Sequence, residues 1–184
     1  LVVCKTDVRV CSVSTDLCFT EDGNLYNEEQ LVMTLIREED LVESIADAFQ
    51  YISYFHPPDF VTSLSSAWER EESQSAKDAM AQILVNSRMA AMGRRPICQD
   101  TGSANVYLEV GYDVKFDFSR SLQEVVDEGV RRGYQFDKNP LRASIVLDPI
   151  GSRKNSGDNT PALLTVDLVP GNAVSVYVLS LIHI

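Results

Sequence analysis

The sequence is poor in histidine and has no close pair of cysteines. Its 184 residues include two His and four Cys, and the cysteines at positions 4, 11, 18 and 98 make no C-x-x-C pair. Zinc knuckles separate paired ligands by roughly two to four residues, so the wider spacing of Cys4, Cys11 and Cys18 does not predict a metal site. A Ser-His-Asp or Cys-His catalytic arrangement has too few histidines. No disulfide framework or signal peptide is indicated, so we expect a reducing, cytoplasmic compartment.

Long apolar runs and an excess of positive charge are also missing. The longest apolar stretches, residues 162–166 and 173–179, are far shorter than the roughly 20 residues that cross a membrane. Sixteen Lys and Arg against 27 Asp and Glu give a formal charge of -11, which disfavours nucleic acid and anionic membranes as partners. No G-x-G-x-x-G or Walker loop supports nucleotide binding. A hydrophobic content of 45% is enough for the core of one domain.

Helical periodicity dominates the first half of the chain. Residues 38–56 have apolar side chains at helical spacing, and Pro57-Pro58 ends the run. A second helix is predicted to begin at Pro58-Asp59. Its inward-facing residues are predicted to be Phe60, Leu64 and Trp68. A third helix is predicted to begin with a capping box formed by Ser75 and Asp78 and to end at Gly93.

Strand composition prevails in the second half. The segments that share it are residues 104–110, 141–147, 162–169 and 173–178. Pro170-Gly171-Asn172 predicts a hairpin turn that joins the last two segments. One more helix is predicted from its N-cap Ser121 to Gly133. Helices followed by a mixed, mostly antiparallel sheet region indicate an α+β fold.

The two ends of the chain differ from what lies between them. Val2 to Val10 alternate like a strand but show no hairpin partner, and Met33 opens a stretch typical of a natural start. We therefore expect residues 1–32 to be an extension, although an ordinary N-terminal strand is the alternative. Residues 33–178 are expected to form the domain, and residues 179–184 a non-native tail.

One loop is dense in functional groups. Arg94 to Gly102, RRPICQDTG, places a thiol, an amide, a carboxylate, a hydroxyl and a glycine at consecutive positions between a helix and a strand. Glycine permits a close approach to a ligand, and proline stiffens the entry. By composition alone, a plain connection with a buried structural cysteine and a turn-forming Asp100 is an equally good interpretation.

Two further features also have a plain and a functional interpretation. Residues 151–161, GSRKNSGDNTP, mix cations, amides and hydroxyls, and by themselves are typical of a solvated loop. Arg142 lies in an apolar strand pattern, where its guanidinium group either faces solvent or binds an anion such as a carboxylate.

Five short motifs in a fixed order carry a family resemblance. RPICQDTG, EGVRRGY, LRASIV, NSGDNTP and VPGN resemble the amino-terminal region of class I fumarases and of their relatives, the alpha subunits of tartrate dehydratase. The resemblance runs from Met33 to about Val178. It implies a lyase of the tricarboxylic acid cycle that interconverts fumarate and malate by reversible hydration at a 4Fe-4S cluster. Family members continue beyond this chain, so the resemblance implies a truncated fragment.

The resemblance also implies roles for single residues. Cys98 matches one of three thiolates that hold the cluster, whose fourth iron is free to stabilise the departing hydroxyl. Asp100 belongs to the acid side, together with a histidine from a later domain. Gln99 and Arg142 hold the substrate carboxylates, and the guanidinium suits bidentate contacts. Asn159 is placed with Thr160 along the same pocket.

The resemblance sets expectations for the purified chain and for the whole enzyme. One thiolate cannot hold a cluster that needs three, so we expect this chain alone to bind no stable 4Fe-4S cluster and to hydrate no fumarate. The full-length enzyme is expected to be a homodimer that acts on a small dicarboxylate. Two alternatives stay open: a tartrate dehydratase alpha subunit, and a non-catalytic domain that binds a dicarboxylate or a partner protein through residues 98–102.

Overall fold

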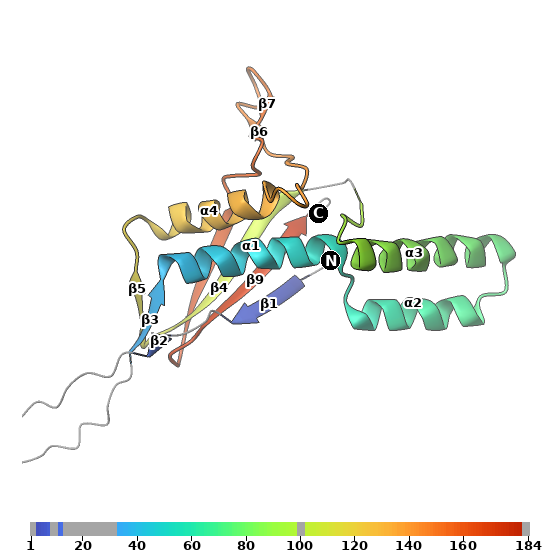
Figure 1. Ribbon diagram of the computed structural model, residues 1–184, viewed down its shortest axis with the longest axis horizontal. Coiled ribbons are helices and arrows are strands. Elements are labelled where there is room, and N and C mark those ends of the chain that lie inside the picture. Colours follow the sequence, from blue (N-terminus) through green and yellow to red (C-terminus); the bar gives the residue numbers. More distant parts are fainter. Residues whose placement is uncertain (1–2, 8–10, 13–32, 99–101, 182–184) are drawn as a thin grey trace, which may run out of the picture.

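The structure is a computed structural model that describes residues 3–7, 11–12, 33–98 and 102–181. Its centre is a four-stranded sheet with two helices packed over one face, which confirms the predicted α+β class (Figure 1). The strands of this sheet, in spatial order, are β1 (Val3–Asp7), β9 (Val174–Leu181), β4 (Ser103–Gly111) and β8 (Leu163–Val169). The two helices are α1 (Glu38–Tyr54) and α4 (Leu122–Tyr134).

Two smaller sheets complete the strand pairing. They consist of β2 (Cys11–Ser12), β3 (Thr34–Arg37) and β5 (Val114–Asp117), and of β6 (Val146–Leu147) with β7 (Lys154–Asn155). Among the described strands, only β4–β8 and β3–β5 pair in parallel, so the prediction of a mixed, mostly antiparallel region is confirmed. β1 pairs with β9, and β2 pairs with β3. The expected domain boundary at residue 33 stays a prediction.

The hydrophobic core lies between the four-stranded sheet and the helices α1 and α4. Along β4, every second side chain is buried, as expected for a strand with one covered face. The buried apolar residues of α1 are Leu41, Val42, Ile45, Ala48, Phe49 and Ile52. Gly129 of α4 allows the two helices to approach closely, because a Cβ atom there would lie 2.8 Å from the Cβ of Ile45.

β8 and β9 are consecutive along the chain but do not pair with each other, so the predicted hairpin is wrong. β4 lies between them, parallel to β8 and antiparallel to β9. The Gly111 amide at the end of β4 donates to the Ala173 carbonyl at 2.9 Å, and the Asp113 amide donates to the Gly171 carbonyl at 3.0 Å. A Cβ atom at Gly111 would lie 2.3 Å from that Gly171 carbonyl oxygen, so glycine permits this insertion.

The predicted strand 141–147 is also wrong, except for its last two residues, which form β6. The amides of Ser144 and Ile145 donate to the side-chain oxygen of Asn159, at 2.7 and 3.1 Å. Because a side chain accepts these hydrogen bonds, the segment has no ladder there and adopts an irregular conformation. Arg142 therefore lies in a loop.

The helices α2 (Pro58–Arg70) and α3 (Gln74–Gly93) form a hairpin that extends away from the sheet (Figure 1). α2 buries none of its residues, and the exposed fractions of Phe60 and Trp68 are 41% and 40%. The predicted inward stripe of α2 is therefore wrong as a buried face: α3 packs along α2, with Lys77 over the Trp68 ring, but Phe60 and Trp68 stay partly exposed. Pro58 does begin the helix, as predicted.

The helix N-termini confirm one capping prediction and contradict another. Ser121 caps α4 in a capping box with Glu124: its hydroxyl accepts from the Glu124 amide, and the Glu124 carboxylate accepts from the Ser121 amide. The capping box predicted at Ser75 and Asp78 is wrong, because α3 begins before Ser75. Its N-cap is Ser73, which makes no side-chain capping bond.

Candidate functional site

Of the four site residues expected from the family motifs, the structure describes Cys98 and Arg142. Gln99 and Asp100 lie outside the described residues. Cys98, the residue before them, has an exposed side chain. Arg142 is exposed in the loop that follows α4. Hydrogen bonds of neighbouring residues fix the backbone near Cys98 and near Arg142.

The chain that leads to Cys98 is fixed at Ile97. The Ile97 amide donates to the carbonyl of Ser53 in α1 at 2.8 Å. Its carbonyl accepts from the Asn86 side chain of α3 at 2.9 Å. Both backbone groups of Ile97 are thus occupied, and they anchor Cys98 to the C-terminal end of α1 and to α3.

The chain resumes at Gly102, which is buried immediately before β4. The Gly102 carbonyl accepts two hydrogen bonds, one from the Asn159 side-chain amide and one from the Ser144 hydroxyl, both at 2.9 Å. Ser144 follows Arg142 by two residues. The Cys98-to-Gly102 loop and the Arg142 segment are therefore tied together at this carbonyl.

The Arg142 segment is also tied to α1, through the buried side chains of Gln50 and Asn139. The Gln50 amide donates to the Asn139 carbonyl at 2.9 Å and to the Gly133 carbonyl at 2.6 Å. The Asn139 side chain donates in return to the Gln50 side-chain oxygen at 2.9 Å. The C-terminal end of α1 is thus a common support for the segments that carry Cys98 and Arg142.

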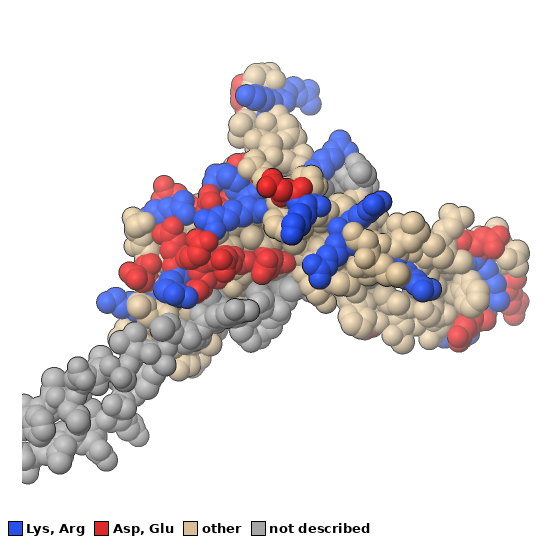
Figure 2. All heavy atoms as spheres, in the orientation of Figure 1, with Lys and Arg blue, Asp and Glu red and all other residues tan. Residues whose placement is uncertain are grey.

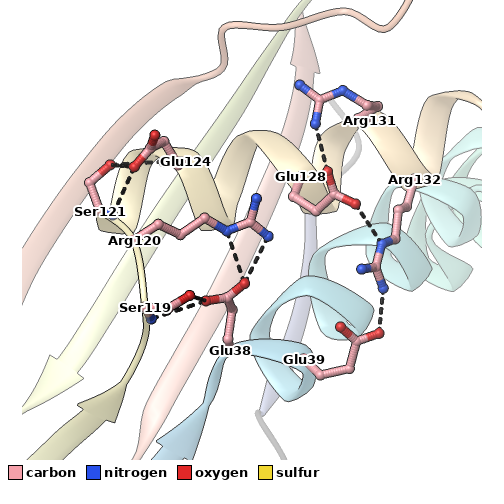
Figure 3. A network of polar contacts seen from close by, with 9 residues as sticks. All are labelled: Glu38, Glu39, Ser119, Arg120, Ser121, Glu124, Glu128, Arg131 and Arg132. Atoms are coloured by element: carbon pink, nitrogen blue, oxygen red, sulfur yellow. Dashed lines mark hydrogen bonds and ion pairs between the residues drawn. The ribbon is translucent and has the colours of Figure 1, made fainter.

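Ion pairs hold α4 against α1 and against the loop that contains Asn159. Arg132 bonds to Glu39 of α1 and to Glu128, while Arg131 bonds to Glu128 at 2.6 Å (Figure 3). Arg131 also reaches Asp158 at 3.0 Å, one residue before Asn159. The hydrogen bond from Arg132 is the main cause that lowers the pKa of Glu128, against desolvation.

Asp158 and Tyr134 have shifted pKa values next to Asn159. Desolvation alone would raise the pKa of Asp158, but hydrogen bonds from Thr160 and Arg131 lower it. The Thr160 hydroxyl donates to Asp158 at 2.8 Å. Burial raises the pKa of the Tyr134 hydroxyl, and hydrogen bonds with Ser180 and Asn159 oppose that rise.

Comparison with known proteins places this arrangement in a family. The family described as fumarate hydratase (Fumerase) matches residues 42–181. The chain belongs to the fumarate hydratase family. This confirms the family predicted from the motifs.

Curated relatives of the chain are named as subunits of tartrate dehydratase. The L(+)-tartrate dehydratase subunit alpha of Escherichia coli K12 is 31% identical over 134 residues, which are 72% of this chain and 43% of that protein. A Methanocaldococcus jannaschii protein provisionally assigned to the same subunit is 28% identical over 119 residues, 64% of this chain and 41% of its own length. This member of the fumarate hydratase family therefore spans about two fifths of the length of these relatives.

The described residues of this fumarate hydratase family member do not by themselves fit a 4Fe-4S cluster. Such a cluster is held by several Cys thiolates, and within the described ranges no three His, Cys, Asp or Glu side chains come together. Cys98 could supply one thiolate.

Within the described ranges, no helix has the length and apolar character needed to span a membrane.

Several residues that organise the site were missed by sequence reasoning. Ser144, Gln50 and Asn139 are neutral polar residues that bond across the fold. Ser144 lies in the family motif LRASIV, but its hydroxyl has no composition signal that predicts a structural bond. Asn159, which is expected with Thr160 along the substrate pocket, has a fully buried side chain. The one available signal was its position in NSGDNTP, a motif shared with the family.

Proposed function

We propose that this chain supplies one side of the active site of a hydro-lyase that interconverts fumarate and malate. The observation that carries the proposal is the junction at Gly102, where its carbonyl and the Ser144 and Ile145 amides bond to one side chain, Asn159. This junction ties the Cys98 loop to the Arg142 segment. Membership of the fumarate hydratase family supports the choice of reaction.

The proposed roles follow from the chemistry of each group. Arg142 binds one substrate carboxylate, for which its planar guanidinium offers two parallel hydrogen bonds. Gln99 donates to the other carboxylate. Asp100 transfers a proton to the departing hydroxyl during dehydration of malate, and takes it back during hydration of fumarate. The base that removes the proton from the neighbouring carbon is assigned to a part of the protein beyond these residues.

Cys98 is proposed as one ligand of a 4Fe-4S cluster, with the remaining thiolates supplied from outside the described residues. Because the family resemblance matches Cys98 to one of the three thiolates that a 4Fe-4S cluster needs, reconstitution of the chain with iron and sulfide under anaerobic conditions should give no stable 4Fe-4S absorbance and no hydration of fumarate. A stable cluster on this chain alone would contradict this assignment. The whole protein is proposed to be a cytoplasmic homodimer.

A titration of the isotope-labelled chain with small acids tests the dicarboxylate site. Fumarate should shift the amide resonances around Cys98 and of Ser144 and Ile145, and Arg142→Gln should weaken binding by about tenfold or more. Propionate, with one carboxylate, serves as the control and should bind much more weakly. Fumarate shifts confined to other surfaces, or equal shifts with propionate, would contradict the proposed site.

A tartrate dehydratase alpha subunit is the second candidate, because the curated relatives carry that name. L-tartrate differs from fumarate by two hydroxyl groups, so it needs hydrogen-bond partners that fumarate does not. The same titration with L-tartrate separates the two candidates. Tighter binding of L-tartrate than of fumarate or malate would favour the second.

A further inference from the structure

We propose that Asn159 is a positioning residue that sets the distance between the two substrate-binding segments. It does so by holding the Gly102 carbonyl on one side and the Ser144 and Ile145 amides on the other. This inference rests on the proposed function, since it concerns the spacing of Cys98 and Arg142. Its structural part stands on hydrogen bonds alone and can be tested separately.

The hydrogen-bonding groups of Asn159 are used inside the protein. Its exposed fraction is 0%. The side-chain oxygen accepts from the Ser144 and Ile145 amides at 2.7 and 3.1 Å, and the side-chain nitrogen donates to the Gly102 carbonyl at 2.9 Å. A buried amide with its oxygen and nitrogen bound in this way fixes the backbone and does not contact substrate.

The Ser144 hydroxyl supports the same junction. It lies 2.9 Å from the Gly102 carbonyl and 3.4 Å from the Asn159 side-chain oxygen. A hydroxyl has one hydrogen to donate, and the shorter distance assigns it to the Gly102 carbonyl. Gly102 is thus held by two donors, while the Ser144 and Ile145 amides depend on Asn159.

The backbone of Asn159 is held in place from α4. Its φ angle is 62°, in the left-handed region that asparagine tolerates better than most residues. The Asn159 amide donates to the Ser156 hydroxyl at 3.0 Å, and the preceding Asp158 is paired with Arg131. The junction is therefore connected to α4, which is itself paired with α1 through Arg132 and Glu39.

Three variants separate the two halves of the junction. Asn159→Gly removes every side-chain bond and suits the positive φ angle. Asn159→Asp keeps the oxygen that accepts from Ser144 and Ile145 but removes the donor to Gly102 when the carboxyl is ionised. Asn155→Ala is the matched control, because this exposed asparagine at the end of β7, four residues before Asn159, bonds to the Ala143 carbonyl and the Gly157 amide instead.

Hydrogen exchange measures the structural part. In Asn159→Gly, the Ser144 and Ile145 amides should exchange about tenfold faster or more, while the β4 and β9 amides stay protected and show that the chain is folded. In Asn159→Asp, the exchange rates of the Ser144 and Ile145 amides should stay within about threefold of those in the parent chain. In Asn155→Ala, the Gly157 amide should exchange faster, while the exchange rates of the Ser144 and Ile145 amides should not change. Unchanged exchange at Ser144 and Ile145 in Asn159→Gly would overturn the proposal.

Fumarate affinity tests whether Asn159 positions the substrate-binding segments. A residue with a merely structural role would not change this affinity. Asn159→Gly should weaken fumarate binding about tenfold, Asn159→Asp by less, and Asn155→Ala by less than about twofold. Unchanged affinity in Asn159→Gly, with a parent chain that binds fumarate, would overturn the positioning role. If the parent chain binds no fumarate, the proposed function fails, and the exchange rates alone then decide whether the junction exists.

Discussion

The helices α1 and α4 and the hairpin of α2 and α3 all carry apolar side chains but end in different surroundings. α1 and α4 bury a continuous apolar face against the sheet. α2 buries none of its residues, and Ser87 and Ala90 are the buried residues of α3. Helical periodicity thus predicts which face of a helix is apolar, while the fold decides how much of that face is buried.

The hairpin consequently shows apolar side chains on its surface. Val85, Met89 and Met92 of α3 follow each other at steps of one helical turn, and Met92 is 76% exposed. Figure 2 shows mainly uncharged surface along the hairpin, with acidic and basic side chains gathered at its far end. Around α1 and α4, by contrast, charges of both signs are interleaved. Paired substitutions in the two regions therefore test whether the α1 and α4 face is buried while the hairpin face is exposed.

The largest expected difference concerns apolar side chains of equal size. Ile45→Ala in α1 removes a fully buried side chain, so we expect a loss of about 2–5 kcal/mol in the free energy of unfolding. Ile83→Ala in α3 removes one that is 44% exposed, and its effect should stay within about 0.5 kcal/mol. Urea denaturation of both variants gives the comparison. Equal losses would show that the hairpin face is covered in solution.

The next difference concerns two glycines in helices. Gly129→Ala places a Cβ 2.8 Å from the Ile45 Cβ, and we expect the overpacking to destabilise the protein by about 1–3 kcal/mol. At Gly93 the nearest atom to a new Cβ is 3.6 Å away, on the Arg95 side chain. Gly93→Ala should therefore be neutral or stabilise by up to about 1 kcal/mol. Thermal unfolding of the two variants checks both signs, and a neutral Gly129→Ala would contradict the close helix contact.

Helix caps should differ by a smaller amount. Ser121→Ala removes the capping box of α4, and we expect a loss of about 1 kcal/mol. Ser73→Ala should cost less, because the Ser73 side chain makes no capping bond to α3. The measurement is again the midpoint of urea denaturation. A larger loss for Ser73→Ala than for Ser121→Ala would reverse the expected order.

The smallest effect is expected from Tyr107 on the outer side of β4. Its hydroxyl donates to Asp167 at 2.5 Å, and this bond, together with desolvation, raises the pKa of Tyr107 to about 12. A folded pKa above the unfolded value of 10.0 means that its contribution to stability is complete below pH 10 and is lost as the pH rises toward about 12. Tyr107→Phe should therefore lose less stability across this range. An identical alkaline profile for both proteins would argue against the bond.

The sequence predicted local structure well and long-range pairing poorly. Glu38, Pro58 and Ser121 mark helix starts through charge, proline and capping preferences, which act within one turn. The strand predicted at 141–147 failed because its amides bond to Asn159, a partner more than ten residues away. The insertion of β4 between β8 and β9 was missed for the same reason: a turn signal does not say what lies between its arms.

In the candidate site, too, single residues could be predicted from the sequence, but the contacts between them could not. Composition and strand pattern mark the Cys98 loop and Arg142 as candidates, while the roles of both residues are expected from the family motifs. The junction that joins their segments was not predicted, because Asn159, Ser144 and Gly102 meet only in the folded chain. Buried amides that bond to distant backbone groups leave no periodic or compositional signal.

The most direct test of the account asks whether Cys98 and Arg142 serve one small molecule. The rate of Cys98 alkylation by iodoacetamide is measured by peptide mass spectrometry, with and without fumarate, in the parent chain and in Arg142→Gln. Fumarate is expected to slow alkylation of Cys98 in the parent chain and to have little effect in the variant. Equal slowing in both proteins, or none in the parent chain, would contradict this expectation.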